Sequence, residues 1–222
     1  MKKKLTIIML ALCLVSCLTL ASVLAIAAQS FTDVATEEEL FTAVRSGGGN
    51  VRLTDNITVE RGTLPINYTT EIDLNGHTLT FREPGMVSVA RYNNGGKEVM
   101  STFPVGIAVN ANFTLSDESK KGKIDVWGDN STGIYVGPTG DLSMWGGTIT
   151  NSYVTIPDGS EETPKYTTGV GIFILRGKVS MTSGSRIENE SQAGVMVCGG
   201  TFSMVGRRTV ISGCGIQSYY GS

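Results

Sequence analysis

The chain has a single histidine, His77, in the stretch Asn75–Thr78, and imidazole is the side chain most often used for proton transfer near neutral pH. A catalytic or metal-binding histidine needs a second group, either a base that orients it or further ligands for a metal ion. No such partner accompanies His77 in the sequence. Because the residue lies on a short strand beside a turn glycine, we expect it to have a structural role.

Carboxylates are the other groups that could do chemistry, because glycoside hydrolases use two of them about 5 to 9.5 Å apart. Asp125, Asp141 and Glu188 are the candidates, but they fall at different positions of the repeat described below and are not expected to converge. The sequence shows no metal-ligand cluster, no nucleotide-binding glycine loop and no Ser/His/Asp arrangement. We therefore assign no catalytic residue, no metal site and no cofactor.

The composition indicates one folded domain rather than a disordered or fibrous chain, since 17% of the 222 residues are charged and only 6 are proline. The formal net charge is −2, and no cluster of lysines and arginines follows Lys4. Nucleic-acid binding proteins usually carry a basic patch. We therefore expect no nucleic-acid partner.

Residues 1–28 differ in kind from the rest, because three lysines precede an apolar run of about 24 residues, Leu5–Ala28. The segment is predicted to be a signal peptide cleaved after Ala27 or Ala28, or a retained membrane anchor, since roughly 20 apolar residues span a bilayer. A third alternative is a lipid on Cys17 in a bacterial lipobox, although apolar residues follow it instead of a polar tether. We expect a secreted or cell-surface protein that meets the membrane only through this segment.

The segment 29–50 contains a helix start signature. Thr36 is a candidate N-cap, Glu39 stands three residues later to complete a capping box, and Gly47–Gly49 end the helix. One short amphipathic helix is therefore predicted before residue 50. Its apolar face consists of Leu40, Ala43 and Val44.

From residue 51 onward the apolar residues alternate in short runs bounded by glycine and asparagine, which indicates strands joined by turns. Four stretches that begin at Gly106, Gly133, Gly169 and Gly194 repeat the same three-strand pattern, and a fifth begins at Gly215. The sharpest match is in the second strand, where the residues Phe113–Leu115, Leu142–Met144, Val179–Met181 and Phe202–Met204 align. The repeat predicts an all-β, right-handed parallel β-helix with three sides over 51–222, with the short helix as its N-terminal cap.

The predicted register places Tyr135, Phe173 and Met196 at one outward position of successive coils. Aromatic faces stacked in this way could bind sugar rings while neighbouring hydroxyls bond the sugar. Alternatively, one of the two segments that interrupt the repeat, 82–105 or 153–168, covers them as a second small core. These three residues are the predicted ligand-binding site.

Two features concern the last coils. Cys198 and Cys214 are either buried small apolar residues or a disulfide pair. The final coil starts at Gly215 and leaves strand edges that invite pairing with another chain. We expect a piece of a longer protein or end-to-end self-association through this coil.

The stretches Glu71–Phe81, Gly133–Ser152 and Gly194–Arg208 resemble the right-handed parallel β-helix, or pectin-lyase-like, domains of exported bacterial surface proteins. The resemblance covers roughly residues 33–222 and implies a non-catalytic surface module, adhesin-like or a stalk, whose partners are glycans or host and cell-surface proteins. It also implies an alternative function, because relatives with this fold include polysaccharide lyases and hydrolases. The chain would then be a carbohydrate-active enzyme of pectate-lyase type or its degenerate remnant.

Overall fold

The computed structural model describes residues 30–92, 97–155, 163–166, 169–182, 184–188, 193–213 and 215–219. Thr32–Ser222 form one compact unit, and it is described here by itself. The predicted signal or anchor, 1–28, and Cys214 lie outside the described residues. Among the residues that are described, none of the helical segments has the length and apolar character needed to cross a bilayer.

The predicted helix is confirmed as α2 (Glu37–Arg45). The Thr36 hydroxyl accepts a hydrogen bond from the Glu39 N–H at 3.2 Å, and the Glu39 carboxylate accepts from the N–H groups of Ala35 and Thr36 at 2.8 and 3.2 Å. The pKa of Glu39 is lowered, chiefly by the hydrogen bond from the Ala35 N–H. The capping box therefore fixes where the helix begins, and Leu40 and Val44 are buried against the first coils.

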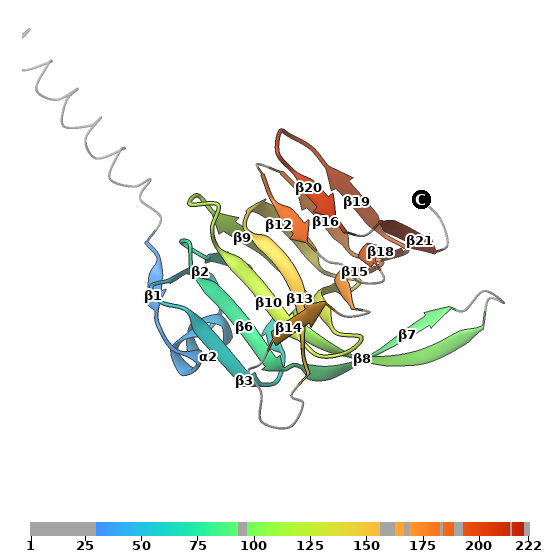
Figure 1. Ribbon diagram of the computed structural model, residues 1–222, viewed down its shortest axis with the longest axis horizontal. Coiled ribbons are helices and arrows are strands. Elements are labelled where there is room, and N and C mark those ends of the chain that lie inside the picture. Colours follow the sequence, from blue (N-terminus) through green and yellow to red (C-terminus); the bar gives the residue numbers. More distant parts are fainter. Residues whose placement is uncertain are drawn as a thin grey trace, which may run out of the picture. The chain divides into compact units, whose positions relative to one another are not determined.

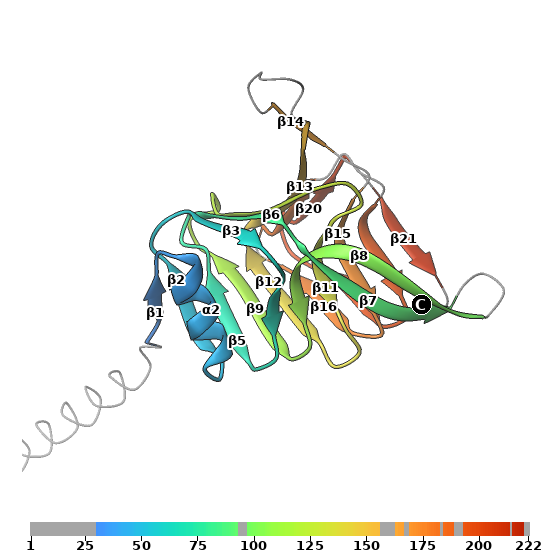
Figure 2. The same cartoon turned by 90° about the horizontal axis from the view of Figure 1, so that it is seen from below.

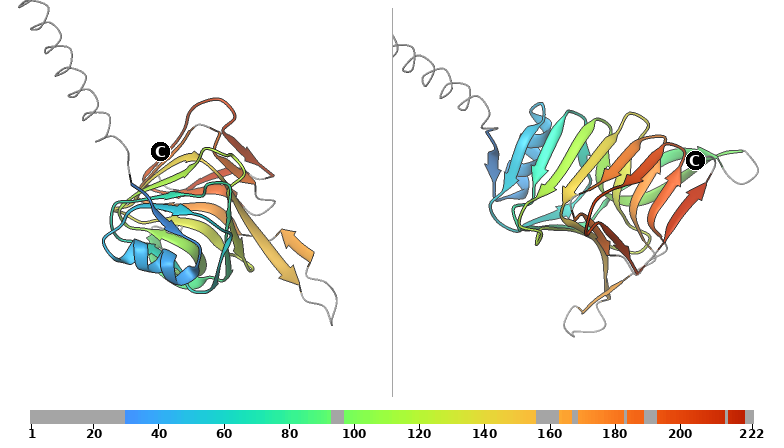
Figure 3. Two further views of the ribbon diagram at one scale, coloured as in Figure 1. Left: turned by 90° about the vertical axis from the view of Figure 1, so that its left-hand side faces the viewer. Right: turned by 90° about the horizontal axis from the view of Figure 1, so that it is seen from above.

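The strands form a three-sided parallel β-helix, and Figure 1 and the right-hand view of Figure 3 show the coils following one another from the N-terminal to the C-terminal end of the solenoid. In spatial order, sheet A consists of β1 (Thr32–Val34), β2 (Gly49–Leu53), β5 (Thr70–Asp73), β9 (Asn112–Asp117), β12 (Asp141–Gly146), β16 (Lys178–Met181) and β19 (Thr201–Met204). Sheet B consists of β3 (Ile57–Arg61), β6 (Thr78–Glu83), β10 (Lys123–Trp127), β13 (Thr148–Thr155), β17 (Arg186–Glu188) and β20 (Val210–Ser212), with β14 (Thr163–Tyr166) beside β13. Sheet C consists of β4 (Leu64–Ile66), β8 (Glu98–Val109), β11 (Thr132–Val136), β15 (Val170–Leu175), β18 (Ala193–Cys198) and β21 (Ile216–Tyr219), with β7 (Gly85–Tyr92) beside β8.

The predicted register of the second strand is confirmed in sheet A. Leu115 pairs with Met144, Met144 with Met181, and Met181 with Met204. The first three side chains are fully buried, whereas Met204 is 46% exposed. Like residues stack because each coil can bury its apolar face only against its neighbours, so the interior is one continuous core.

Glycines at the same position of successive strands, which we call a file, explain how sheet C fits beside sheet B. Gly133 lies next to Gly106 and Gly171 in the paired strands, one residue before the buried isoleucines. A Cβ atom on Gly133 would lie 2.5 Å from the Gly171 carbonyl oxygen and 2.7 Å from a methyl group of Ile149. No larger residue fits there without moving the backbone. In the third repeat this position is taken by Gly171, two residues after Gly169, where the repeat was expected to begin.

Two antiparallel hairpins depart from the solenoid, and they correspond to the two segments that interrupt the repeat. β7 and β8 form the first, and β13 and β14 form the second. Figure 2 shows the β7–β8 hairpin running across the strands of sheet C, and the left view of Figure 3 shows β13 and β14 extending away from the coils. The two insertions therefore lie on different sides of the solenoid.

Candidate functional site

The outer face of sheet C carries the predicted ligand-binding residues. Tyr135 pairs with Phe173, and Phe173 pairs with Met196. The rings of Tyr135 and Phe173 are stacked, with centroids 6.0 Å apart and planes at 20°. The predicted outward file is therefore present, one residue per coil.

The β7–β8 hairpin covers this file. Phe103 from β8 sets its ring edge-on at 5.2 Å from Phe173 and 6.3 Å from Tyr135, measured between centroids. Tyr135 and Phe173 are only 7% and 4% exposed, and burial raises the pKa of Tyr135. The file belongs to a second small apolar core, in which Met196 and Cys198 are half-buried. Ligand binding by these residues stays a prediction, and it requires the hairpin to move away from the rings.

The outer face of sheet B holds a buried carboxylate network around Asp125. The carboxylate accepts hydrogen bonds from the hydroxyls of Thr150 and Ser152, both at 2.8 Å, and from the indole N–H of Trp127 at 3.1 Å. Lys123 lies 3.6 Å away. Asp125 thus orders the side chains of two neighbouring strands, which is a structural role.

The three candidate carboxylates do not form one group. Asp141 lies on sheet A. Asp125 and Glu188 share a file of sheet B, contrary to the expectation that they occupy different positions of the repeat, because Thr150 pairs with Asp125 and the β13–β17 register continues to Glu188. With one strand between them, their backbones are roughly 9 to 10 Å apart. Glu188 binds Arg186 at 2.6 Å, so each carboxylate has its own partner.

The backbone of His77 closes a turn, and a structural role for its imidazole stays a prediction. Its backbone N–H donates to the Leu74 carbonyl at 2.8 Å, and its own carbonyl accepts from the backbone N–H of Lys123 at 3.1 Å. Among the described residues, no group of three His, Cys, Asp or Glu side chains is placed to hold a metal ion.

In the described part of the chain, neither hairpin pairs with sheet A, since β14 pairs with β13 of sheet B and β7 with β8 of sheet C. One file of the outer face of sheet A runs through Glu71 and the expected hydroxyl residues Thr114, Ser143, Ser180 and Ser203. The adjacent file contains Asp73, Ser116 and Trp145. We call these two files the sheet A face.

Trp145 places a large aromatic side chain on the sheet A face, and this side chain is 59% exposed. Ser116 pairs with Trp145 in the register and donates its hydroxyl hydrogen bond to Glu71 at 2.9 Å. Asp73 binds Arg52 at 3.1 Å. An exposed indole thus stands beside an ordered row of hydroxyls and carboxylates. The sequence analysis did not single out Trp145, although its position immediately after the inward Met144 marks it as outward-facing.

Comparisons of the chain with protein-family models, with curated proteins and with solved structures find no match. The fold alone therefore defines the class of this protein, which is a three-sided parallel β-helix with a helix beside its first coil.

Proposed function

We propose that this protein is a non-catalytic, exported surface module whose rigid solenoid binds glycans through the sheet A face. Kinship with the pectin-lyase-like domains of bacterial surface proteins is part of the proposal. It is supported by the three parallel sheets, the capped first coil and the stacked interior files. The main observation behind the proposed binding function is Trp145, whose side chain is 59% exposed on the sheet A face.

The physical basis is the match between this face and a sugar chain. An indole face binds the apolar face of a pyranose ring, while hydroxyl and carboxylate groups bond the sugar hydroxyls. Strands of one sheet are about 4.8 Å apart, so the row of Thr and Ser side chains offers a polar group at each coil. Glu71 accepts from Ser116, which orients one hydroxyl of the face before any ligand arrives. Because these side chains are already ordered, less conformational entropy is lost when a ligand binds.

The test is a glycan array probed with the polypeptide 30–222 and with its Trp145→Ala variant. The proposal predicts binding of a defined set of glycans and a loss of affinity of at least about tenfold in the variant, because truncation of a central tryptophan typically removes a large part of the binding energy. Tyr68→Ala is the matched control. Tyr68 is 52% exposed but lies between β4 and β5, outside the sheet A face, and its removal is expected to leave binding unchanged.

Two results would contradict the proposal. Equal binding by the Trp145→Ala variant would place the ligand elsewhere, for example on the covered Tyr135 file. Release of unsaturated or reducing sugar ends from a bound polysaccharide would favour the alternative, a carbohydrate-active enzyme.

A further inference from the structure

Four turns stack at the corner between sheets A and B, one after each of β9, β12, β16 and β19. They comprise the residues 118–122, 147, 182–185 and 205–209. Backbone hydrogen bonds join one coil to the next at this corner. The N–H of Thr148 donates to the Gly122 carbonyl at 3.0 Å, and that of Arg186 donates to the Gly147 carbonyl at 2.9 Å. The turns therefore follow one another along one edge of the solenoid, as Figure 1 shows.

The charges of these turns are mostly of one sign. Four cationic residues lie in them, Lys120, Lys121, Arg207 and Arg208, against a single carboxylate, Glu118. All four cationic residues are exposed. Among the described residues, no ion pair involves any of the four. We call the four turns the basic ridge, and four positive charges against one negative charge give it a formal charge of +3.

The cations of the basic ridge form two pairs. The lysine pair, Lys120 and Lys121, lies in the turn after β9, and the arginine pair, Arg207 and Arg208, lies in the turn after β19. These two strands are three strand spacings apart in sheet A. Because neighbouring strands are about 4.8 Å apart, the two pairs are roughly 14 Å from each other along the solenoid axis. The two turns between them contain no charged residue, so the ridge presents two separate double charges.

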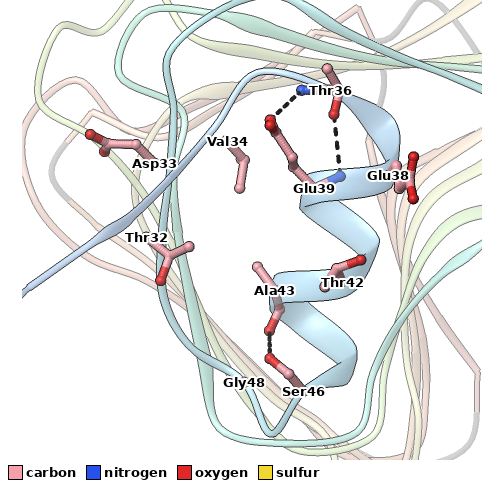
Figure 4. A pocket seen from close by; sticks show the side chains of 10 residues that line it. All are labelled: Thr32, Asp33, Val34, Thr36, Glu38, Glu39, Thr42, Ala43, Ser46 and Gly48. Carbon is pink, nitrogen blue, oxygen red and sulfur yellow. Dashed lines mark hydrogen bonds between the residues drawn. The ribbon is translucent and has the colours of Figure 1, made fainter.

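The first coils have the opposite charge. Asp33 on β1 and Glu38 on α2 line a cleft of about 610 Å³ between these two elements (Figure 4). Glu39 belongs to the same wall, and its carboxylate accepts the hydrogen bonds of the capping box. Carboxylates in a cleft repel an anion. The charge distribution of the solenoid therefore favours an anionic ligand at the basic ridge.

Trp145 of the sheet A face lies beside the basic ridge. It is on β12, two residues before the turn at Gly147. In sheet A, β12 is one strand from β9 and two strands from β19, so the indole lies between the lysine pair and the arginine pair along the axis. A glycan that stacks on Trp145 and runs along the axis therefore meets both pairs.

We infer that the glycan bound by the sheet A face carries phosphate monoester groups, one bound by the lysine pair and another by the arginine pair. The inference rests on the proposed function, because the same sugar chain stacks on Trp145. A phosphate monoester carries a charge of about −1.5 to −2 at pH 7, which matches two cations better than the single charge of a carboxylate or a sulfate ester does. Arginine also donates paired hydrogen bonds to phosphate oxygens, and lysine binds phosphate as a point charge.

Binding of three dextrans to the polypeptide 30–222 tests the inference, since Thr32–Ser222 form one compact unit with its own core. One dextran carries phosphate monoesters, one carries sulfate esters at the same degree of substitution, and one is plain. At low salt, phosphorylated dextran should bind at least about tenfold more tightly than plain dextran, because hydrogen bonds to charged groups are the stronger ones. Sulfated dextran should lie between the two. Added salt should reduce the difference.

Two variants assign this charge effect to the basic ridge. Lys120→Gln with Lys121→Gln removes the lysine pair, and Arg207→Gln with Arg208→Gln removes the arginine pair. Each variant should bind phosphorylated dextran about fivefold to tenfold more weakly, because one of the two contacts is lost. The affinity for plain dextran should not change.

The matched control is Arg176→Gln with Lys178→Gln, which removes the same charge. Both residues are exposed, but Arg176 precedes β16 and Lys178 begins it, at the opposite end of this strand from the ridge. The control should bind phosphorylated dextran like the unaltered protein.

Three results would overturn the inference: no binding of phosphorylated dextran at low salt, equal affinity for phosphorylated and plain dextran, or an equal loss of affinity in the control variant. The proposed function would still stand if Trp145→Ala weakened glycan binding. Binding that is sensitive to the ridge variants but not to Trp145→Ala would instead contradict the proposed function.

Discussion

The methionine file of sheet A runs from the middle of the solenoid to its last described coil, and its members have different surroundings. Met144 and Met181 are fully buried between neighbouring coils, whereas Met204 is 46% exposed. Near the N-terminal end, Val51 in β2 is 1% exposed, because β1 pairs beyond β2 and α2 packs beside the first coils. The stability of a solenoid coil depends on contacts with the coils beside it, and β1 and α2 provide these contacts for the first coils.

The largest effect expected from this comparison is in the methionine file. Met144→Ala removes a side chain that is fully enclosed and should lower the free energy of unfolding by about 2 to 5 kcal/mol. Met204→Ala removes the equivalent side chain of the last coil and should cost less than about 1 kcal/mol, because water already reaches it. Urea unfolding of the two variants measures the difference. Equal losses would mean that the last coil is as well packed as the middle.

The glycine file gives the second prediction. A Cβ atom on Gly133 would lie 2.5 Å from a backbone carbonyl oxygen, so Gly133→Ala should destabilise the protein by about 1 to 3 kcal/mol. Gly215 precedes Ile216 as Gly133 precedes Ile134, yet a Cβ there meets no atom within 4 Å. Gly215→Ala should therefore leave the melting temperature nearly unchanged. A large drop in the Gly215→Ala variant would show that another coil or chain packs over this end.

A smaller effect is expected at the capped end. Thr36→Ala removes the hydroxyl that accepts from the Glu39 N–H and should cost about 1 kcal/mol. Thermal unfolding followed by circular dichroism measures the shift. Thr36→Ser keeps the hydroxyl and is the control. If both variants behave alike, the capping box does not stabilise the first coil.

The smallest predicted effect concerns the covered face of sheet C and appears only at alkaline pH. Burial raises the pKa of Tyr135 above its usual value of 10.0, so the folded protein holds the phenol proton more tightly than the unfolded chain does. The stabilisation that comes from protonated Tyr135 is fully present below the pKa of the unfolded chain, and it is lost as the pH rises through the pKa of the folded protein. Tyr135→Phe should reduce the loss of stability above about pH 10. Identical alkaline unfolding of both proteins would show that Tyr135 ionises freely.

The core could be predicted from the sequence because residues that stack in successive coils recur at the same position of the sequence repeat. The files at Ile107, Ile134 and Ile172 repeat in the sequence, and the structure pairs them directly. Thr36 and Glu39 fixed the helix start by local chemistry alone. The helix start depends only on residues close in the sequence, and the stacked isoleucines depend only on the length of one repeat.

The candidate sites were less predictable because they depend on contacts between distant segments. The cover of Tyr135 by Phe103 could be stated only as an alternative, since nothing local determines which way a hairpin folds. The shared file of Asp125 and Glu188 was missed, although each residue directly follows an inward isoleucine of its third strand, Ile124 and Ile187.

Hydrogen–deuterium exchange of the polypeptide 30–222 tests most directly that the coils stabilise one another by stacking, so that the last described coil of this polypeptide is less protected than the middle coils. The account predicts slow exchange in β9 and β12, nearly as slow exchange in β2, which lies between β1 and β5, and faster exchange in β19, β20 and β21. Uniform protection along the three sheets, or exchange that begins at β2, would contradict it.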